Sequence, residues 1–153
     1  MGTKPDPVLI RDAVAADIPA MVELLSQLFS IEQDFVPDAD KQGRGLVLLL
    51  AHAGAHMLVA ELEGRVVGMI TTQTLISTAE GGPVGLVEDL VVAEPHRGKG
   101  IGRQLLQTME TRARDTGLTR LQLLADSDNA PALDFYTQRG WRRTSLLALR
   151  RNS

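Results

Sequence analysis

The sequence has no cysteine, only three lysines and no long hydrophobic run. Without cysteine, disulfides, thiolate metal sites and a cysteine nucleophile are excluded. The longest apolar stretch, residues 46–51, is far shorter than the roughly 20 residues of a membrane-spanning helix. Residues 1–7 are polar and contain proline instead of the apolar segment of an export signal. We therefore expect a cytoplasmic protein with a flexible tail at residues 1–7 and no membrane partner.

Charge is nearly balanced, with 16 basic and 19 acidic residues and a net charge of −3. A broad nucleic-acid-binding surface needs a basic face, so we expect no nucleic-acid partner. Most of the basic residues are arginines, and arginine suits phosphate binding in a fixed geometry. The composition thus excludes a broad nucleic-acid surface but allows phosphate binding at a defined site.

The 153 residues suit one domain, which we place at residues 8–150. Apolar spacing and turn residues predict strands at 8–10, 57–62, 66–75, 84–92, 121–125 and 141–149, and helices at 18–29, 45–53, 101–116 and 129–139. Asp17 is the expected N-cap of the first helix, and Glu63-Gly64-Arg65 the turn of a hairpin. The hairpin favours antiparallel pairing, and the later strand–helix–strand units favour parallel pairing. A mixed α/β sheet with helices on both faces is expected.

The most informative stretch runs from a strand into a helix over residues 91–102. Its alternating glycines are Gly98, Gly100 and Gly102, and the cations beside them are Arg97, Lys99 and Arg103. Glycine lets the backbone approach a ligand closely, and the N–H groups at a helix start favour an anion. The pattern predicts a cradle for a diphosphate.

Three phosphate-binding patterns compete for this turn. A P-loop needs Ser or Thr after Gly-Lys, but Gly100 follows Gly98-Lys99. The dinucleotide fingerprint needs a different glycine spacing, although Asp126 lies at about the distance of a ribose-binding acid, so an NAD-binding protein stays an alternative. The pattern Arg/Gln-x-x-Gly-x-Gly/Ala fits Arg97, Gly100 and Gly102 without a gap. Glycines that merely tighten a turn are the remaining interpretation.

With these residues in place, the sequence resembles the GNAT superfamily of N-acetyltransferases. The resemblance rests on residues 86–92 leading into the turn at 97–102, and on residues 129–136 followed by Gly140-Trp141. It covers nearly the whole chain, except for residues 30–55, which carry no family signature. It implies an α/β fold with a central mixed, mostly antiparallel sheet that is splayed at its middle.

The resemblance also implies acetyl-CoA as co-substrate, without a metal. The strand before the turn would contact the pantothenate arm, and the turn would hold the pyrophosphate. The residues implied in cofactor binding are Leu90, Val91, Val92, Arg97, Gly98, Lys99, Gly100, Ile101, Gly102, Arg103, Asn129 and Tyr136.

Acetyl transfer to an amine requires loss of the amine proton and stabilisation of the thioester oxygen, and the departing thiolate is better protonated. By resemblance, Tyr136, the only tyrosine, protonates the thiolate; packing of its ring in the core is the alternative. Glu88 and Asp89 are candidate bases, with Glu88 first, and as strand neighbours they are expected on opposite faces. A purely structural role for both, with water as the base, stays open. Direct attack in a ternary complex is favoured because there is no cysteine.

The acceptor is predicted less sharply than the donor. The acidic residues Glu32, Asp34, Asp38 and Asp40 would attract a cationic amine, or merely form a solvated loop. His52 and His56 are four residues apart, but Gly54 lies between them and no third ligand is evident, so no metal site is expected. The sequence thus predicts an N-acetyltransferase for a primary amine of a small molecule or peptide, and the resemblance suggests a homodimer. A non-catalytic acyl-CoA-binding module is the alternative.

Overall fold

A computed structural model describes residues 7–32 and 34–153. Apart from Pro7, the tail predicted at residues 1–7 lies outside the described residues. The chain divides into two compact units, residues 1–122 and 123–153, and each is described by itself. The expectation of one domain over residues 8–150 stays a prediction.

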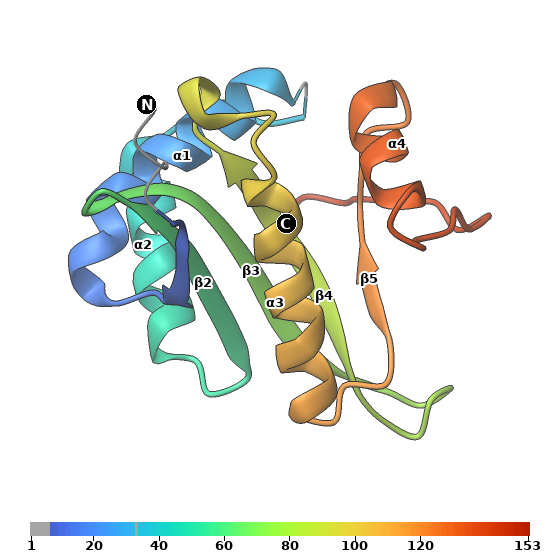
Figure 1. The fold of residues 1–153 in the computed structure, drawn as a ribbon. Helices are drawn as coiled ribbons and strands as arrows, with labels where there is room; N and C mark the ends of the chain where they lie inside the picture. The colour runs from blue at the N-terminus through green and yellow to red at the C-terminus, as the bar shows by residue number, and fades with distance from the viewer. Residues whose placement is uncertain (1–6, 33) are drawn as a thin grey trace. The chain divides into compact units, whose positions relative to one another are not determined.

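The elements follow one another in the order that the sequence predicts up to the last helix (Figure 1). They are β1 (Leu9–Asp12), α1 (Ile18–Ile31), α2 (Ala39–Ala51), β2 (Ala55–Leu62), β3 (Arg65–Ser77), β4 (Gly82–Val92), α3 (Ile101–Asp115), β5 (Leu121–Leu123) and α4 (Ala130–Thr137). Short 3-10 turns precede α1 at Ala15–Asp17 and follow β4 at Glu94–His96. Among the described residues, no helix has the length and apolar content required to cross a bilayer.

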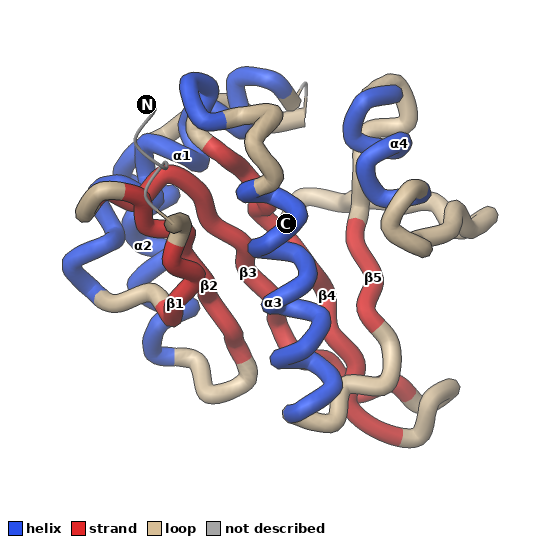
Figure 2. The backbone as a smooth tube through the Cα atoms, viewed as in Figure 1, coloured by secondary structure: helices blue, strands red, loops and turns tan. Residues whose placement is uncertain are grey.

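The strands form one sheet in chain order, β1-β2-β3-β4-β5 (Figure 2). The β1–β2, β2–β3 and β3–β4 pairs are all antiparallel. The sheet is covered on both faces, with α2 on one side of β2 and α3 on the other. The structure confirms the α/β class and a mostly antiparallel sheet, while a splay at its middle stays a prediction.

Each helix of the first unit buries the apolar stripe that the sequence shows. Met21, Leu24 and Leu25 of α1 join Leu46 of α2 in a cluster with side chains of β2, β3 and β4. The buried residues of α3 are Ile101, Leu105, Leu106, Met109 and Ala113. Because these positions recur every three or four residues, one face of each helix is apolar and packs on the sheet.

The hairpin between β2 and β3 turns through Glu63 and Gly64, with φ values of 51° and 76°. Two consecutive residues with positive φ are typical of a type I′ turn, whose twist matches that of the flanking strands. The hairpin prediction is confirmed, with Arg65 already the first residue of β3.

Asp17 occupies the N-cap position of α1, but its side chain does not cap the helix. Its carboxylate accepts hydrogen bonds from the Val14 N–H at 2.8 Å and from the two amino groups of Arg11 at 2.8 and 3.0 Å. The side chain therefore closes the turn that precedes α1 and ties it to β1. The sequence predicts the position but not the partners.

Helix α2 begins at Ala39, six residues before the expected start at Gly45. The Asp38 carboxylate accepts from the Lys41 N–H at 3.1 Å, and the Gln42 amide oxygen accepts from the Asp38 N–H at 2.7 Å. These reciprocal bonds satisfy backbone groups that would otherwise be exposed at the helix start. They extend the helix through Gly43, where the sequence favours irregular structure.

The final strand expected at residues 141–149 is wrong. These residues are all described, and they pair with no other described strand. The leucines at positions 146, 147 and 149 are exposed. A strand is stable when its backbone is paired and one of its faces is buried, and this segment meets neither condition. The helix before it is shorter than expected, with Asn129 as its N-cap.

Candidate functional site

Strand β4 is irregular at its middle. The register between β3 and β4 shifts so that Asp89 and Leu90 lie opposite the single residue Ile70. Asp89 has a φ of 56°, in the left-handed region that Asp tolerates better than most residues. This is a β-bulge, a feature that re-aims side chains and is common beside active sites. Strict alternation of Glu88 and Asp89 between two faces assumes a regular strand, so that argument fails here.

Asp89 combines burial with negative neighbours. Burial and then the nearby Glu88 carboxylate raise its pKa to about 6; a hydrogen bond from Thr71 lowers it, and Glu32 raises it further. The Thr71 hydroxyl lies 3.2 Å from Asp89 Oδ2, whereas Glu88 is exposed. A carboxylate with a pKa near 6 is charged at neutral pH and still basic enough to take a proton.

The glycine turn forms where the sequence predicts it, immediately before α3. Gly98 and Gly100 have φ values of 75° and 82°, a conformation that glycine adopts without strain. A Cβ at either residue would meet no described atom within 4 Å, so the backbone faces open space. Gly100 is the N-cap of α3 and Gly102 lies in its first turn. The first N–H groups of a helix have no partner within it, so the turn suits an anion.

The cations and apolar residues of the turn have separate roles. Arg97, Lys99 and Arg103 are exposed, and Arg97 Nε donates to the Val92 carbonyl at 2.8 Å. Ile101 is buried and anchors the start of α3, so only its backbone is available to a ligand. The structure thus brings the bulge, the end of β4 and the glycine turn together in the first unit.

Close packing beneath the turn fixes the start of α3 on the sheet. A Cβ at Gly68 of β3 would lie 3.1 Å from Leu105 Cδ1 and 3.3 Å from the Val91 carbonyl oxygen. Glycine at this position therefore lets α3 approach the sheet closely. As a result, the turn is held by the core and not only by its own loop.

The second unit contains the other two predicted site residues. Asn129 accepts from the Ala132 N–H at 3.2 Å and so caps α4. The Tyr136 ring lies edge-on to Phe135, with 5.2 Å between ring centroids, and 5.7 Å from Trp141. The backbone N–H of Trp141 donates to the backbone carbonyl of Tyr136 at 3.1 Å. The aromatic contacts fix the ring, which is compatible with either predicted role of the tyrosine.

A family model described as the acetyltransferase (GNAT) family matches residues 18–141. The chain belongs to the GNAT family. It is 29% identical to an aminoalkylphosphonate N-acetyltransferase of Salmonella typhimurium over 88% of this chain and 85% of that protein. It is 33% identical to an aminoglycoside N(6')-acetyltransferase of Stenotrophomonas maltophilia over 73% of this chain and 71% of that protein.

Solved structures show the same fold. A predicted acetyltransferase with acetyl-CoA from Clostridium acetobutylicum superposes with a TM-score of 0.77 at 19% identity, over 94% of this chain and 96% of that one. At this identity the likeness shows the GNAT fold alone.

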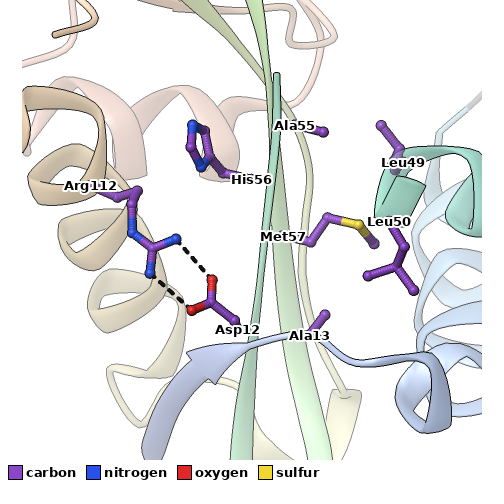
Figure 3. A pocket seen from close by; sticks show the side chains of 8 residues that line it. All are labelled: Asp12, Ala13, Leu49, Leu50, Ala55, His56, Met57 and Arg112. Atoms are coloured by element: carbon purple, nitrogen blue, oxygen red, sulfur yellow. Dashed lines mark hydrogen bonds and ion pairs between the residues drawn. The ribbon is translucent and has the colours of Figure 1, made fainter. Parts of the chain in front are cut away.

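This GNAT chain also has a pocket that the sequence does not indicate (Figure 3). It measures about 200 Å³ and is lined by Asp12, Ala13, Leu49, Leu50, Ala55, His56, Met57 and Arg112. Arg112 pairs with Asp12 through two hydrogen bonds of 2.8 and 3.2 Å. Burial and the Arg112 charge lower the pKa of His56, although Asp12 opposes them. No local signal predicts this pair, because its partners are 100 residues apart in the sequence.

The histidines considered as metal ligands do not share a helix. His52 follows α2, and its Nδ1 accepts from the Gly54 N–H at 2.9 Å. His56 lies in β2. Within residues 7–32 and 34–153, no three His, Cys, Asp or Glu side chains form a group that could hold a metal.

Thr71, a second feature missed from sequence, is buried on β3 opposite the bulge. It lies within hydrogen-bonding distance of both the Glu88 carbonyl and the Asp89 carboxylate. Its sequence position inside an apolar strand gives no hint of these contacts, because they depend on the shifted register of β4.

Proposed function

We propose that this GNAT chain is an acetyl-CoA-dependent N-acetyltransferase that acetylates a primary amine by direct attack in a ternary complex. One observation carries the proposal: the strand that bears Asp89, with its pKa of about 6, leads through one short 3-10 turn into the open glycine turn. A proton acceptor and an anion cradle thus lie on one continuous segment. A cytoplasmic location and a homodimer stay predictions.

The donor half of the proposal rests on the turn. Backbone N–H groups between Arg97 and Gly102 would bind the coenzyme A pyrophosphate, with the cations of the turn beside it. The backbone of residues 90–92 would pair with the pantothenate arm, and Asn129 would contact the arm. Open space at Gly98 and Gly100 supports this assignment, because a close ligand needs it.

The chemical half assigns the proton transfers. Asp89 accepts the proton that the substrate ammonium loses, which leaves a neutral amine to attack the thioester carbonyl carbon. As the new C–N bond forms and the C–S bond breaks, Tyr136 gives its proton to the departing thiolate. The second proton that the nitrogen must lose to become an amide then returns to the Tyr136 phenolate, and Asp89 releases the first proton to solvent. We place Asp89 before Glu88 as the base, because Glu88 is exposed and Asp89 is not.

The acceptor is proposed to be a cationic amine. Glu32 and Glu88 act electrostatically on Asp89, so the bulge carboxylate has two further carboxylates near it. Asp38 caps α2, which leaves it less suited to bind a substrate. The relatives named for aminoglycoside and aminoalkylphosphonate acetylation make small amines of these classes the first acceptors to test.

Binding is tested by isothermal titration calorimetry with acetyl-CoA, using two matched glycine variants. Gly98 and Gly64 have φ values of 75° and 76°, and neither has a described atom near its Cβ position. Alanine therefore strains both to the same extent, by about 1 kcal/mol. We expect Gly98→Ala to weaken acetyl-CoA binding by about tenfold or more, and Gly64→Ala to leave it unchanged. Equal affinities in both variants would contradict the cradle.

Turnover is tested by free-thiol release from acetyl-CoA against a panel of aminoglycosides, aminoalkylphosphonates, polyamines and peptides. The expected result is thiol release that depends on one class of amine. Acetyl-CoA binding without release for any amine would instead support the non-catalytic acyl-CoA-binding module. Binding of NAD but not acetyl-CoA would overturn both.

A further inference from the structure

Thr71 lies where β3 faces the bulge, and its side chain is only 1% exposed. Its Oγ1 is 3.2 Å from the Glu88 carbonyl oxygen and 3.2 Å from Asp89 Oδ2. A threonine hydroxyl has one proton to donate and can also accept. It therefore cannot donate fully to both oxygens at once, although the two distances are equal.

We propose that Thr71 is a positioning residue for acetyl transfer: its hydroxyl holds Asp89 in the bulge and exchanges hydrogen-bond partners when Asp89 gains or loses a proton. When Asp89 is a carboxylate, Thr71 donates to it. When Asp89 has taken a proton, its Oδ–H donates to Thr71 Oγ1, and Thr71 donates to the Glu88 carbonyl. The two states of Asp89 differ only by the proton taken from the substrate. In each of them, every O–H group of Thr71 and Asp89 has an acceptor. The inference rests on the proposed role of Asp89 as the base.

The groups around Asp89 determine how much its charged form depends on the hydrogen bond from Thr71. Glu88 on the same strand and Glu32 after α1 both disfavour the charged carboxylate, as does burial. The Thr71 hydrogen bond opposes all three, because it stabilises the charged form. Without it, Asp89 would hold a proton at a higher pH and would be unavailable as a base over more of the neutral range.

The next residue provides a matched control. Thr72 is also 1% exposed, but its Oγ1 has no hydrogen-bond partner among the described residues. Thr71→Val and Thr72→Val thus remove the same hydroxyl from adjacent buried positions of one strand. They differ in whether that hydroxyl contacts Asp89.

The first measurement is the titration of the Asp89 side-chain carboxyl by ¹³C NMR on the whole chain, which needs no substrate. We expect Thr71→Val to raise the Asp89 pKa by about one unit, since a hydrogen bond to a charged group is lost. Thr71→Ser, which keeps the hydroxyl, should restore it, and Thr72→Val should leave it unchanged. If Thr71→Val does not fold, Thr71→Ala replaces it in the same comparison with Thr71→Ser.

The second measurement is the pH dependence of kcat from thiol release, with an amine found in the acceptor panel. The acidic limb should move to higher pH in Thr71→Val by the same shift as the NMR titration. An unchanged Asp89 titration in Thr71→Val, or an equal shift in Thr72→Val, would overturn the role of Thr71. A shift by NMR with an unmoved acidic limb would support the contact with Thr71 but contradict Asp89 as the base, so the two failures are distinguishable.

Discussion

At the scale of single residues, Asp89 is held in an unfavourable conformation and an unfavourable environment. It combines a left-handed backbone conformation with burial and two negative neighbours. A non-glycine residue in this region costs on the order of 1 kcal/mol, and such residues cluster at functional sites. A base with a pKa near 6 is useful for catalysis, but its burial is unfavourable for folding. Replacing the Asp89 carboxylate should therefore lower activity and raise stability.

Asp89→Asn is expected to lower kcat by about 100-fold and to stabilise the fold at pH 7. The folded pKa of about 6 lies above the unfolded value of about 3.9. Protonation therefore favours the folded state, and the wild type gains stability from this group as pH falls from 6 towards 4. At pH 7 the charged carboxylate costs about 3 kcal/mol, which Asn avoids. Thiol release measures kcat, and urea denaturation at pH 7 and pH 4.5 measures the free energy of unfolding of the variant and the wild type. A variant that is less stable than the wild type at pH 7 would contradict the explanation.

Two arginine–aspartate pairs allow the effect of burial to be measured. Asp17 pairs with Arg11 and its side chain is 8% exposed, whereas Asp12 pairs with Arg112 and is 65% exposed. Hydrogen bonds from the arginines lower the pKa of both carboxyls. Their contributions to stability are therefore present above the unfolded pKa of about 3.9 and are lost as pH falls through the folded values.

We expect Asp17→Asn to lower the free energy of unfolding at pH 7 by about 2 kcal/mol, because Arg11 loses two short charged hydrogen bonds and keeps only the longer contact with Glu61 at 3.6 Å. Asp12→Asn should lower it by less than about 1 kcal/mol, as for other exposed pairs. Urea denaturation of both variants compares them directly. Equal losses would show that burial does not decide the difference.

At the scale of elements, β4 depends on one glycine for its packing. A Cβ at Gly85 would lie 2.6 Å from Leu121 Cδ2 and 2.8 Å from Thr72 Cγ2. The Gly85 N–H also donates to the Arg120 carbonyl at 2.9 Å. The strand therefore meets its neighbours too closely for any side chain at this position.

Gly85→Ala is expected to destabilise the fold by about 2 kcal/mol through overpacking. Gly82→Ala, at the start of the same strand, is the matched control, because a Cβ there meets no described atom within 4 Å. It should change stability by less than about 0.5 kcal/mol. Thermal unfolding of the two variants provides the comparison, and a tolerated Gly85→Ala would show that β4 and its neighbours can separate.

The elements also show which features a sequence can predict. The hairpin at Glu63 and Gly64 and the start of α3 follow from local turn chemistry, so both were predictable. The bulge at Asp89 depends on how β4 registers against β3, and no local pattern encodes that. The start of α2 was missed because Gly43 and Gly45 obscure the capping by Asp38. The last strand was wrong because apolar alternation does not supply a pairing partner.

At the scale of the whole molecule, burial is distributed unequally between the two units. The first unit contains every buried residue, and none of residues 123–153, all of which the structure describes, is buried. Local stability follows buried apolar contacts and protected backbone hydrogen bonds. The second unit, which contains the proposed acid Tyr136, is therefore expected to open more readily than the sheet.

Amide hydrogen exchange followed by mass spectrometry tests this expectation. Peptides from residues 123–153 should exchange at least about tenfold faster than peptides from β2, β3 and β4, because little apolar area resists their opening. Saturating acetyl-CoA should slow exchange around residues 97–102 and 129–136. Equal protection of both units in the ligand-free protein would contradict the unequal burial.

The hydrogen bond from Arg97 Nε to the Val92 carbonyl bears on the entropy of binding an anion at the turn. An arginine fixed in advance loses fewer rotamers when an anion arrives, and immobilising such a side chain otherwise costs about 1 kcal/mol. Lysine at position 97 would keep the positive charge. It would lack the planar guanidinium group, whose Nε bonds to Val92 while its two amino groups stay available to an anion. If the turn binds the diphosphate as proposed, part of its affinity for that anion comes from side-chain entropy already lost in the free protein.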